Sequence, residues 1–172
     1  MELWDVYDSQ GNVTGRVKER GSCFEEGEYH LAASLWIISS EGKTLLQKRS
    51  MAKSLHPGLW NITGGAASAG ESSVEACIRE VAEEIGFSLQ PQDIKLLERS
   101  FHKDNIFDDY IITRDFDINE AVLQPEEVTE LCWFTIEEIR ALYAEGKFMF
   151  SNISKLDRVE SYIKKEEMKW GL

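Results

Sequence analysis

Runs of apolar residues along the chain predict a series of short β-strands. The run over residues 29–38 is almost continuously apolar, which is typical of a strand buried on both faces. Shorter runs bounded by turn residues predict further strands. These lie at Leu3–Tyr7, around Val13 and Val17, at Thr44–Arg49, at 94–101, at 107–116 and at Val128–Phe134. The first two flank a polar turn, so we expect an N-terminal β-hairpin.

Three segments carry the spacing and the end signals of α-helices. Residues 72–85 begin at a capping box of Ser72 and Glu75 and end before Gly86, a favourable C-cap. A second capping box, Thr135 and Glu138, opens a helix, and residues 154–169 predict a last amphipathic one. Residues 50–71 show no regular period and are expected to be irregular. Together these elements indicate an α+β fold with a mixed sheet flanked by helices.

The length of 172 residues suits a single domain over residues 1–172, with residues 1–27 as a hairpin extension. Apolar residues make up 42% and charged residues 29%, which is typical of a folded globular protein. No apolar run approaches the ~18 residues that a membrane span needs, and the N-terminus does not resemble a signal peptide. Cys23, Cys77 and Cys132 form no CxxC pair, so we expect a cytoplasmic protein without disulfides or structural zinc.

The charge balance narrows the class of partner. The chain has 19 basic and 31 acidic residues, a net charge of -12, which argues against nucleic-acid binding because the phosphate backbone would be repelled. A small phosphate-bearing substrate stays compatible with this charge, since metal ions can sit between an acidic protein and a phosphate. We therefore expect a small-molecule substrate, no nucleic acid and no membrane. The hairpin could pair with a second copy, which leaves a homodimer open.

The helix predicted at residues 72–85 has one apolar side and one acidic side. At about 100° per residue, an apolar stripe that includes Cys77 would pack on a core, while Glu80, Glu83 and Glu84 gather on a second arc. Carboxylates one turn apart repel each other and weaken a helix, and a divalent cation would remove that repulsion. Carboxylate oxygens favour Mg²⁺ or Mn²⁺ over zinc. The alternative is a solvated acidic face without a ligand, and the helix by itself does not decide between them.

The segment that contains this helix resembles the Nudix box, and this resemblance implies a metal site on the helix. The pattern is Gly65-x5-Glu71-x7-Arg79-Glu80-Val81-x-Glu83-Glu84-x-Gly86-Phe87, within residues 64–87, and it departs from the box at no position. The order of the flanking strands and helices is also similar to a Nudix domain. The resemblance implies a Nudix-type α/β/α sandwich with a mixed sheet and a loop–helix box. It covers nearly the whole chain.

The resemblance also implies roles for individual residues. Glu80 and Glu84 would be metal ligands, and Glu83 would share the cluster directly or through water. Arg79 would orient Glu83 or its neighbour, so that Glu80, Glu83 and Arg79 form the catalytic group. Glu71 would brace the junction between loop and helix. Gly64 and Gly65 would let the backbone approach metal or substrate phosphate, and a carbonyl there could complete a coordination shell.

The first 60 residues resemble the Nudix branch related to type I isopentenyl-diphosphate isomerase. The resemblance rests on residues 3–8, 29–32, 45–50 and 57–60. It implies that Arg49 and Lys53 hold the substrate diphosphate; the alternative is a pair of exposed surface cations. The isomerase also needs a cysteine and a histidine in the loop before the helix, where this chain has Gly64 and Ala66. We therefore expect hydrolysis and not isomerisation.

Four further sets of residues have both a functional and a structural interpretation. His30 matches a metal-binding histidine of the isomerase branch, but its loop partner is replaced, so we expect a structural or substrate-contacting role. Trp60 could stack on a base or cover a prenyl chain, although packing is the simpler interpretation. Asp108 or Asp109 could add a metal ligand. Glu126 or Glu127 could act as a general base.

The sequence thus predicts a Mg²⁺-dependent hydrolase, with Mn²⁺ able to substitute. It would act as a pyrophosphatase on the diphosphate linkage of a nucleoside-diphosphate derivative or another organic diphosphate, by attack of a metal-activated water. Two alternatives remain: isopentenyl-diphosphate isomerase-like activity, and a non-catalytic Nudix module that senses a nucleotide. Sensing modules usually lack box carboxylates, and all of them are present here. The specificity loops carry no motif that names the substrate.

Overall fold

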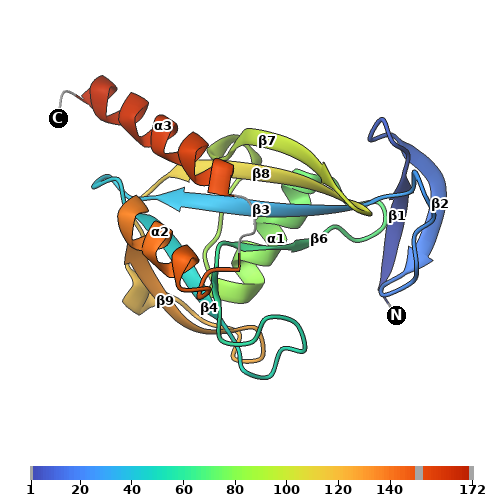
Figure 1. The fold of residues 1–172 in the computed structure, drawn as a ribbon, viewed down its shortest axis with the longest axis horizontal. Helices are drawn as coiled ribbons and strands as arrows, with labels where there is room; N and C mark the ends of the chain where they lie inside the picture. The colour runs from blue at the N-terminus through green and yellow to red at the C-terminus, as the bar shows by residue number, and fades with distance from the viewer. Residues whose placement is uncertain (1, 150–152, 171–172) are drawn as a thin grey trace. The chain divides into compact units, whose positions relative to one another are not determined.

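The structure, a computed structural model, describes residues 2–149 and 153–170 (Figure 1). The strands are β1 (Leu3–Tyr7), β2 (Val13–Glu19), β3 (His30–Ile38), β4 (Thr44–Arg49), β5 (Trp60–Asn61), β6 (Thr63–Ala66), β7 (Lys95–His102), β8 (Asn105–Thr113) and β9 (Val128–Phe134). The α-helices are α1 (Ser73–Ile85), α2 (Ile136–Ala144) and α3 (Ile153–Trp170). Short 3-10 turns lie at Pro91–Asp93 and Ile118–Glu120.

The chain divides into two compact units. The first comprises Met1–Leu35, Gly64–Ala82 and Ser88–Ile111. In it, β1 and β2 form the antiparallel hairpin, drawn in blue in Figure 1. Backbone hydrogen bonds of 2.8 and 3.0 Å between Tyr7 and Tyr29 join this hairpin to the start of β3. The strands β7 and β8 form a second antiparallel pair in the same unit.

The second unit comprises Trp36–Thr63, Glu83–Phe87 and Ile112–Leu172. In it, β4 pairs antiparallel with β5 and with β9, so it is hydrogen-bonded on both sides. The helix α2 begins at the predicted capping box of Thr135 and Glu138 and lies against β9 (Figure 1). Hydrogen-bonded strands follow the order β5-β4-β3-β8-β7, with β6 paired to β3 and β9 to β4.

Helix α1 has the predicted signals at both ends. The Ser72 backbone N–H donates to the Glu75 carboxylate at 2.8 Å, and the Glu75 N–H donates back to the Ser72 hydroxyl at 3.3 Å. Gly86 follows the helix with a φ of 78°, the left-handed conformation that glycine adopts without strain. Of the predicted apolar stripe, Cys77, Val81 and Ile85 are fully buried and Val74 and Ile78 are half-buried. Because this stripe packs into the core, the acidic arc lies on a different side of the helix.

Three local predictions were wrong. Within the stretch expected to be irregular, residues 60–61 form β5 against β4, and residues 63–66 form β6, because Gly64 lies close enough to β3 for backbone pairing. The strand expected at 107–116 runs from Asn105 to Thr113, since the Phe116 ring leaves the ladder to stack on Phe87. Finally, β3 is buried continuously only over its second half; its first half alternates between buried and half-buried positions.

The α+β class, the mixed sheet with helices and the N-terminal hairpin are confirmed. Within residues 2–149 and 153–170, no helix combines the length and the apolar character needed to span a membrane.

Candidate active site

Arg79 on α1 is the centre of an ion-pair cluster in the first unit. Its Nε and Nη2 donate to the two oxygens of Glu71 at 2.8 and 3.0 Å, and its Nη1 donates to Oε1 of Glu80 at 2.8 Å. Nη2 also donates to the carbonyl of Ala66 at 3.1 Å. Glu71 raises the pKa of Arg79; burial would raise the pKa of Glu71, but the hydrogen bonds from Arg79 hold it below its usual value. Arg79 thus ties the end of β6 to helix α1.

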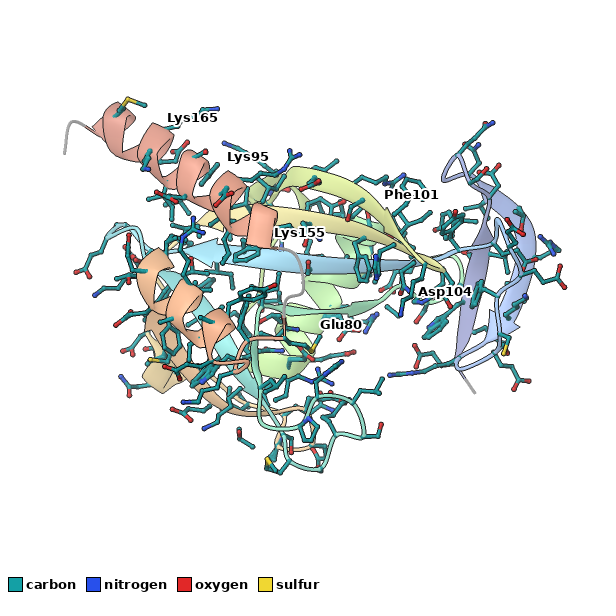
Figure 2. All side chains as sticks on the ribbon, in the orientation of Figure 1. Glu80, Lys95, Phe101, Asp104, Lys155 and Lys165 are labelled. Carbon is teal, nitrogen blue, oxygen red and sulfur yellow. The ribbon has the colours of Figure 1, made fainter. Side chains whose placement is uncertain are left out.

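The two glycines of β6 have different neighbours. A Cβ on Gly65 would lie 2.4 Å from the carboxyl carbon of Glu80, so the missing side chain makes room for this carboxylate. A Cβ on Gly64 would lie 2.3 Å from the carbonyl oxygen of Ala33, which is backbone and cannot move aside. Figure 2 labels Glu80 among the side chains. The absence of a side chain at Gly65 therefore makes room for a carboxylate of the acidic arc. At Gly64 the absence of a side chain allows β6 to pack closely on β3.

Glu84, on the same helix, is anchored within the second unit. Its Oε2 accepts a 2.8 Å hydrogen bond from Nε2 of Gln47, and Oε1 of Gln47 accepts one from the Thr63 hydroxyl at 2.9 Å. All three side chains are buried. By contrast, Glu83 is exposed on the helix surface. Because one helix carries Glu80, Glu83 and Glu84, helical spacing alone places the first and the last one turn apart on one side.

One loop of the second unit is hydrogen-bonded to the end of α1, and a second loop is hydrogen-bonded to the first. The N–H of Gln124 donates to the carbonyl of Glu84 at 3.1 Å, and the N–H of Ser50 donates to the carbonyl of Glu127 at 2.8 Å. The ammonium group of Lys53 lies 2.5 Å from Oε2 of Glu127. Arg49 donates instead to the carbonyl of Leu55, at 3.2 and 3.1 Å. Of the two predicted clamp cations, Lys53 therefore contacts the loop that carries Glu127, and Arg49, the last residue of β4, contacts the loop that follows this strand.

The donor set of α1 fits a hard divalent cation. Among the described residues, no group of three or more His, Cys, Asp or Glu side chains is already gathered as a metal site. Within the first unit Arg79 donates to Glu80, and within the second unit Gln47 donates to Glu84. The side chains available are carboxylates, the ligands that Mg²⁺ and Mn²⁺ prefer, and the space beside Gly65 is open for the Glu80 carboxylate.

The remaining candidates lie in structural contacts. Asp108 is buried and takes two hydrogen bonds from Arg99, at 2.6 and 2.7 Å, and Asp109 accepts one from Ser34 at 2.6 Å. The His30 ring stacks on Trp4 with centroids 4.3 Å apart, and burial lowers its pKa.

Two further residues pack as the sequence suggested. Trp60 is 9% exposed and packs edge-on against Phe134, with centroids 4.9 Å apart. Cys77 lies fully buried in the apolar stripe of α1, where burial raises the pKa of its thiol to about 12. A thiol with this pKa is protonated at neutral pH and is no nucleophile.

Gln47 is the residue that sequence reasoning missed. It was assigned only to the strand Thr44–Arg49, with no role in the site. The available signal was a polar residue directly after two buried leucines, at a position 2% exposed in the structure. A buried amide needs partners, but the sequence does not say that one of them is Glu84.

Comparison with known proteins bears on this arrangement. Residues 28–152 match the NUDIX domain. The chain is 36% identical over 151 residues to a Nudix hydrolase of Listeria monocytogenes, covering 87% of this chain and 89% of the relative. It is 30% identical over 150 residues to an isopentenyl-diphosphate Delta-isomerase of Serratia proteamaculans, covering 80% and 79%.

A solved structure supports the fold. The crystal structure of DR0079 from Deinococcus radiodurans matches with a TM-score of 0.76 at 22% identity, covering 92% of this chain and 99% of that chain. At this identity the likeness establishes a shared fold only. The match to the domain and the similarity to the Listeria enzyme show that this chain belongs to the Nudix hydrolase family.

Proposed function

We propose that this Nudix hydrolase is Mg²⁺-dependent and cleaves the diphosphate linkage of a nucleoside-diphosphate derivative or another organic diphosphate. The observation that carries the proposal is the acidic arc of α1, with Glu84 buried against Gln47 and Glu80 held by Arg79 beside Gly65. Glu84 is only 5% exposed, and burying a carboxylate costs free energy unless it is hydrogen-bonded, paired with an opposite charge or bound to a metal. Mn²⁺ is expected to substitute for Mg²⁺ because both prefer oxygen ligands.

Glu80 and Glu84 would hold the metal, with Glu83 sharing the cluster directly or through water. Bound there, Mg²⁺ would polarise the phosphoryl group and lower the pKa of the attacking water. Arg79 would keep the Glu80 carboxylate turned toward the arc, since the same guanidinium is anchored on Glu71 and on the Ala66 carbonyl. The exposed Glu83 would take the proton or orient the water.

Substrate phosphates would be held by Arg49 and Lys53 and by the backbone at Gly64 and Gly65. The Arg49 guanidinium donates two hydrogen bonds to one neutral carbonyl, that of Leu55, and its fork of N–H donors suits a phosphate. Lys53 is paired with Glu127, so a phosphate would compete with that carboxylate for the ammonium group. This competition favours substrates with a strong negative charge, such as a diphosphate.

Isomerisation is the weaker candidate despite the similarity to an isomerase. Gly64 stands where the isomerase branch places its loop cysteine, and a Cβ there would meet the Ala33 carbonyl at 2.3 Å. A cysteine is therefore not merely missing but has no room in this backbone. Ala66 offers no side chain that could bind a metal.

The single-domain organisation, a homodimer and a cytoplasmic location stay predictions.

The test is release of phosphate or of a nucleoside monophosphate from a panel of nucleoside-diphosphate derivatives and prenyl diphosphates, with Mg²⁺ and with EDTA. Hydrolysis of a panel member that EDTA abolishes is the expected result. Conversion of isopentenyl diphosphate to dimethylallyl diphosphate would overturn the proposal in favour of isomerisation. Tight binding of a nucleotide without turnover would instead assign the chain as a sensing module.

A further inference from the structure

Three buried side chains form a hydrogen-bonded row that ends at Glu84. Thr63 is 4% exposed, Gln47 2% and Glu84 5%. The Thr63 hydroxyl lies 2.9 Å from Oε1 of Gln47, and Nε2 of Gln47 lies 2.8 Å from Oε2 of Glu84. The residues come from β6, β4 and α1, so strand and helix segments far apart in sequence meet at one carboxylate.

The chemistry of the groups sets the direction of each hydrogen bond. An ionised carboxylate only accepts, so Gln47 must turn its NH₂ toward Glu84 and its carbonyl oxygen toward Thr63. The Thr63 hydroxyl must then donate. With the hydroxyl replaced by a methyl group, the amide oxygen of Gln47 would be buried without its donor, and the amide would lose one of the two hydrogen bonds that set its orientation.

The strand that carries Gln47 is held on both sides. Gln47 lies opposite Asn61 of β5 and opposite Leu131 of β9 in antiparallel ladders. A residue in the centre of paired strands has little backbone freedom, and burial restricts its side-chain rotamers as well. Gln47 is therefore a rigid support, in contrast to a glutamine on a loop.

We propose that Gln47 is a positioning residue that orients the Glu84 carboxylate for the metal, and that Thr63 fixes the orientation of the Gln47 amide. The inference rests on the proposed function, in which Glu84 is a metal ligand. Partners of this kind set the plane of a ligating carboxylate, and their loss typically weakens metal affinity or activity by about 10–100-fold. Here the support is an amide that stays uncharged at every working pH.

The experiment compares four near-isosteric variants with the unchanged protein. It measures Mn²⁺ binding, read from the EPR signal of free Mn²⁺, together with kcat and melting temperature. Gln47→Met removes the donor to Glu84, and Thr63→Val removes the donor to Gln47. Thr63→Ser keeps the hydroxyl and is the rescue variant. Thr44→Val is the matched control, because Thr44 lies on the same strand, is fully buried, and its Oγ1 has no hydrogen-bond partner among the described residues.

We expect Gln47→Met to weaken Mn²⁺ binding by about 10–100-fold and to lower kcat by a similar factor. Thr63→Val should have a smaller effect in the same direction, and Thr63→Ser and Thr44→Val should bind as the unchanged protein does. A merely structural role of Gln47 would lower the melting temperature without changing Mn²⁺ affinity, and that result overturns the proposal. Should Gln47→Met fail to fold, the two Thr63 variants decide: equal Mn²⁺ affinity for Val and Ser overturns it.

Glu84→Gln separates this inference from the proposed function. If Glu84→Gln binds Mn²⁺ as tightly as the unchanged protein, Glu84 is no ligand and the metal site itself is wrongly assigned. If Glu84→Gln loses Mn²⁺ while Gln47→Met and Thr63→Val keep it, the metal site stands and only the positioning role is refuted.

Discussion

The ammonium group of Lys53 lies 2.5 Å from the carboxylate of Glu127, a residue of the loop that is hydrogen-bonded to the end of α1. The two side chains are 21% and 28% exposed, so the pair is accessible from solvent. If Lys53 binds the substrate diphosphate, as proposed, the phosphate would compete with Glu127 for the ammonium group. Binding of the phosphate and release of the Glu127 carboxylate would then occur together.

Lys53→Ala and Arg49→Ala should each raise KM for a diphosphate substrate, by roughly tenfold or more, with a smaller change in kcat. A cation that grips the phosphates equally in the ground and transition states contributes to binding and not to the chemical step. Steady-state kinetics on the best panel substrate measures both constants. Lys48→Ala is the control, because Lys48 lies next to Arg49 on β4 and pairs with Glu130 at 3.3 Å. An unchanged KM would show that Arg49 or Lys53 is a surface cation that does not bind the substrate.

Glu80→Gln and Glu84→Gln should each lower kcat by about two orders of magnitude or more, while the protein stays folded. Each change removes a negative charge from the proposed metal site and keeps the shape of the side chain. Glu75→Gln on the same helix serves as the control, because glutamine also satisfies a capping box. Retention of more than about half of the turnover by either variant would remove it from the metal ligands.

Gly65→Ala and Gly64→Ala should fail in different ways. The new methyl group at Gly65 would meet the end of the Glu80 side chain, which can move away, so kcat should fall with little change in melting temperature. At Gly64 the methyl group would meet the backbone of Ala33, so the melting temperature should fall. Thermal unfolding and steady-state kinetics on both variants distinguish the two. A stable and fully active Gly65→Ala protein would show that the Glu80 carboxylate is not needed in its present place.

EDTA should abolish activity, and Mg²⁺ or Mn²⁺ should restore it. Ca²⁺ should bind but support little turnover, because its larger radius and looser geometry position the reacting groups less well. The melting temperature should rise at millimolar Mg²⁺ by mass action on the folded state. Activity that persists in EDTA, or that depends on zinc retained through purification, would exclude the acidic arc as the metal site.

The pH dependence of stability should show the contribution of Glu28, which precedes β3. Its carboxylate is buried and accepts hydrogen bonds from Lys18, from the Glu25 N–H at 3.0 Å and from Arg16 at 2.6 Å. Lys18 above all lowers the pKa of Glu28 from 4.5 to about 2. A carboxyl whose pKa is lower in the folded state stabilises the fold above its unfolded pKa and loses that contribution as pH falls.

Glu28→Gln should therefore lower the free energy of unfolding at neutral pH. The gap to the unchanged protein should shrink as the pH falls from 4.5 towards about 2. Urea unfolding at about pH 7, pH 5 and pH 3 follows this gap. If the difference in the free energy of unfolding stays constant between about pH 5 and pH 3, the ion pairs of Glu28 do not stabilise the folded protein.

Local signals in the sequence determined the elements that their own residues specify. The capping boxes at Ser72 and Thr135 and the left-handed glycine after α1 set the helix ends, because capping depends on residues three or four positions apart. The strands Leu3–Tyr7, Thr44–Arg49 and Val128–Phe134 have the bounds expected from their apolar runs. The acidic arc also followed from the sequence, since one helix carries it and helical spacing orders its side chains.

Only the tertiary structure decided what holds those side chains. The strand β6 exists because β3 accepts it as a neighbour, although its glycines have no preference for strands. The partnership of Gln47 with Glu84 joins residues 37 positions apart, and that of Lys53 with Glu127 joins residues 74 apart. No local pattern encodes such pairs, because hydrogen bonds between distant residues form only after the chain has packed. The sequence alone therefore determined which carboxylates the helix presents, and the packing of β4, β6 and the loop after Gln124 decided how they are anchored.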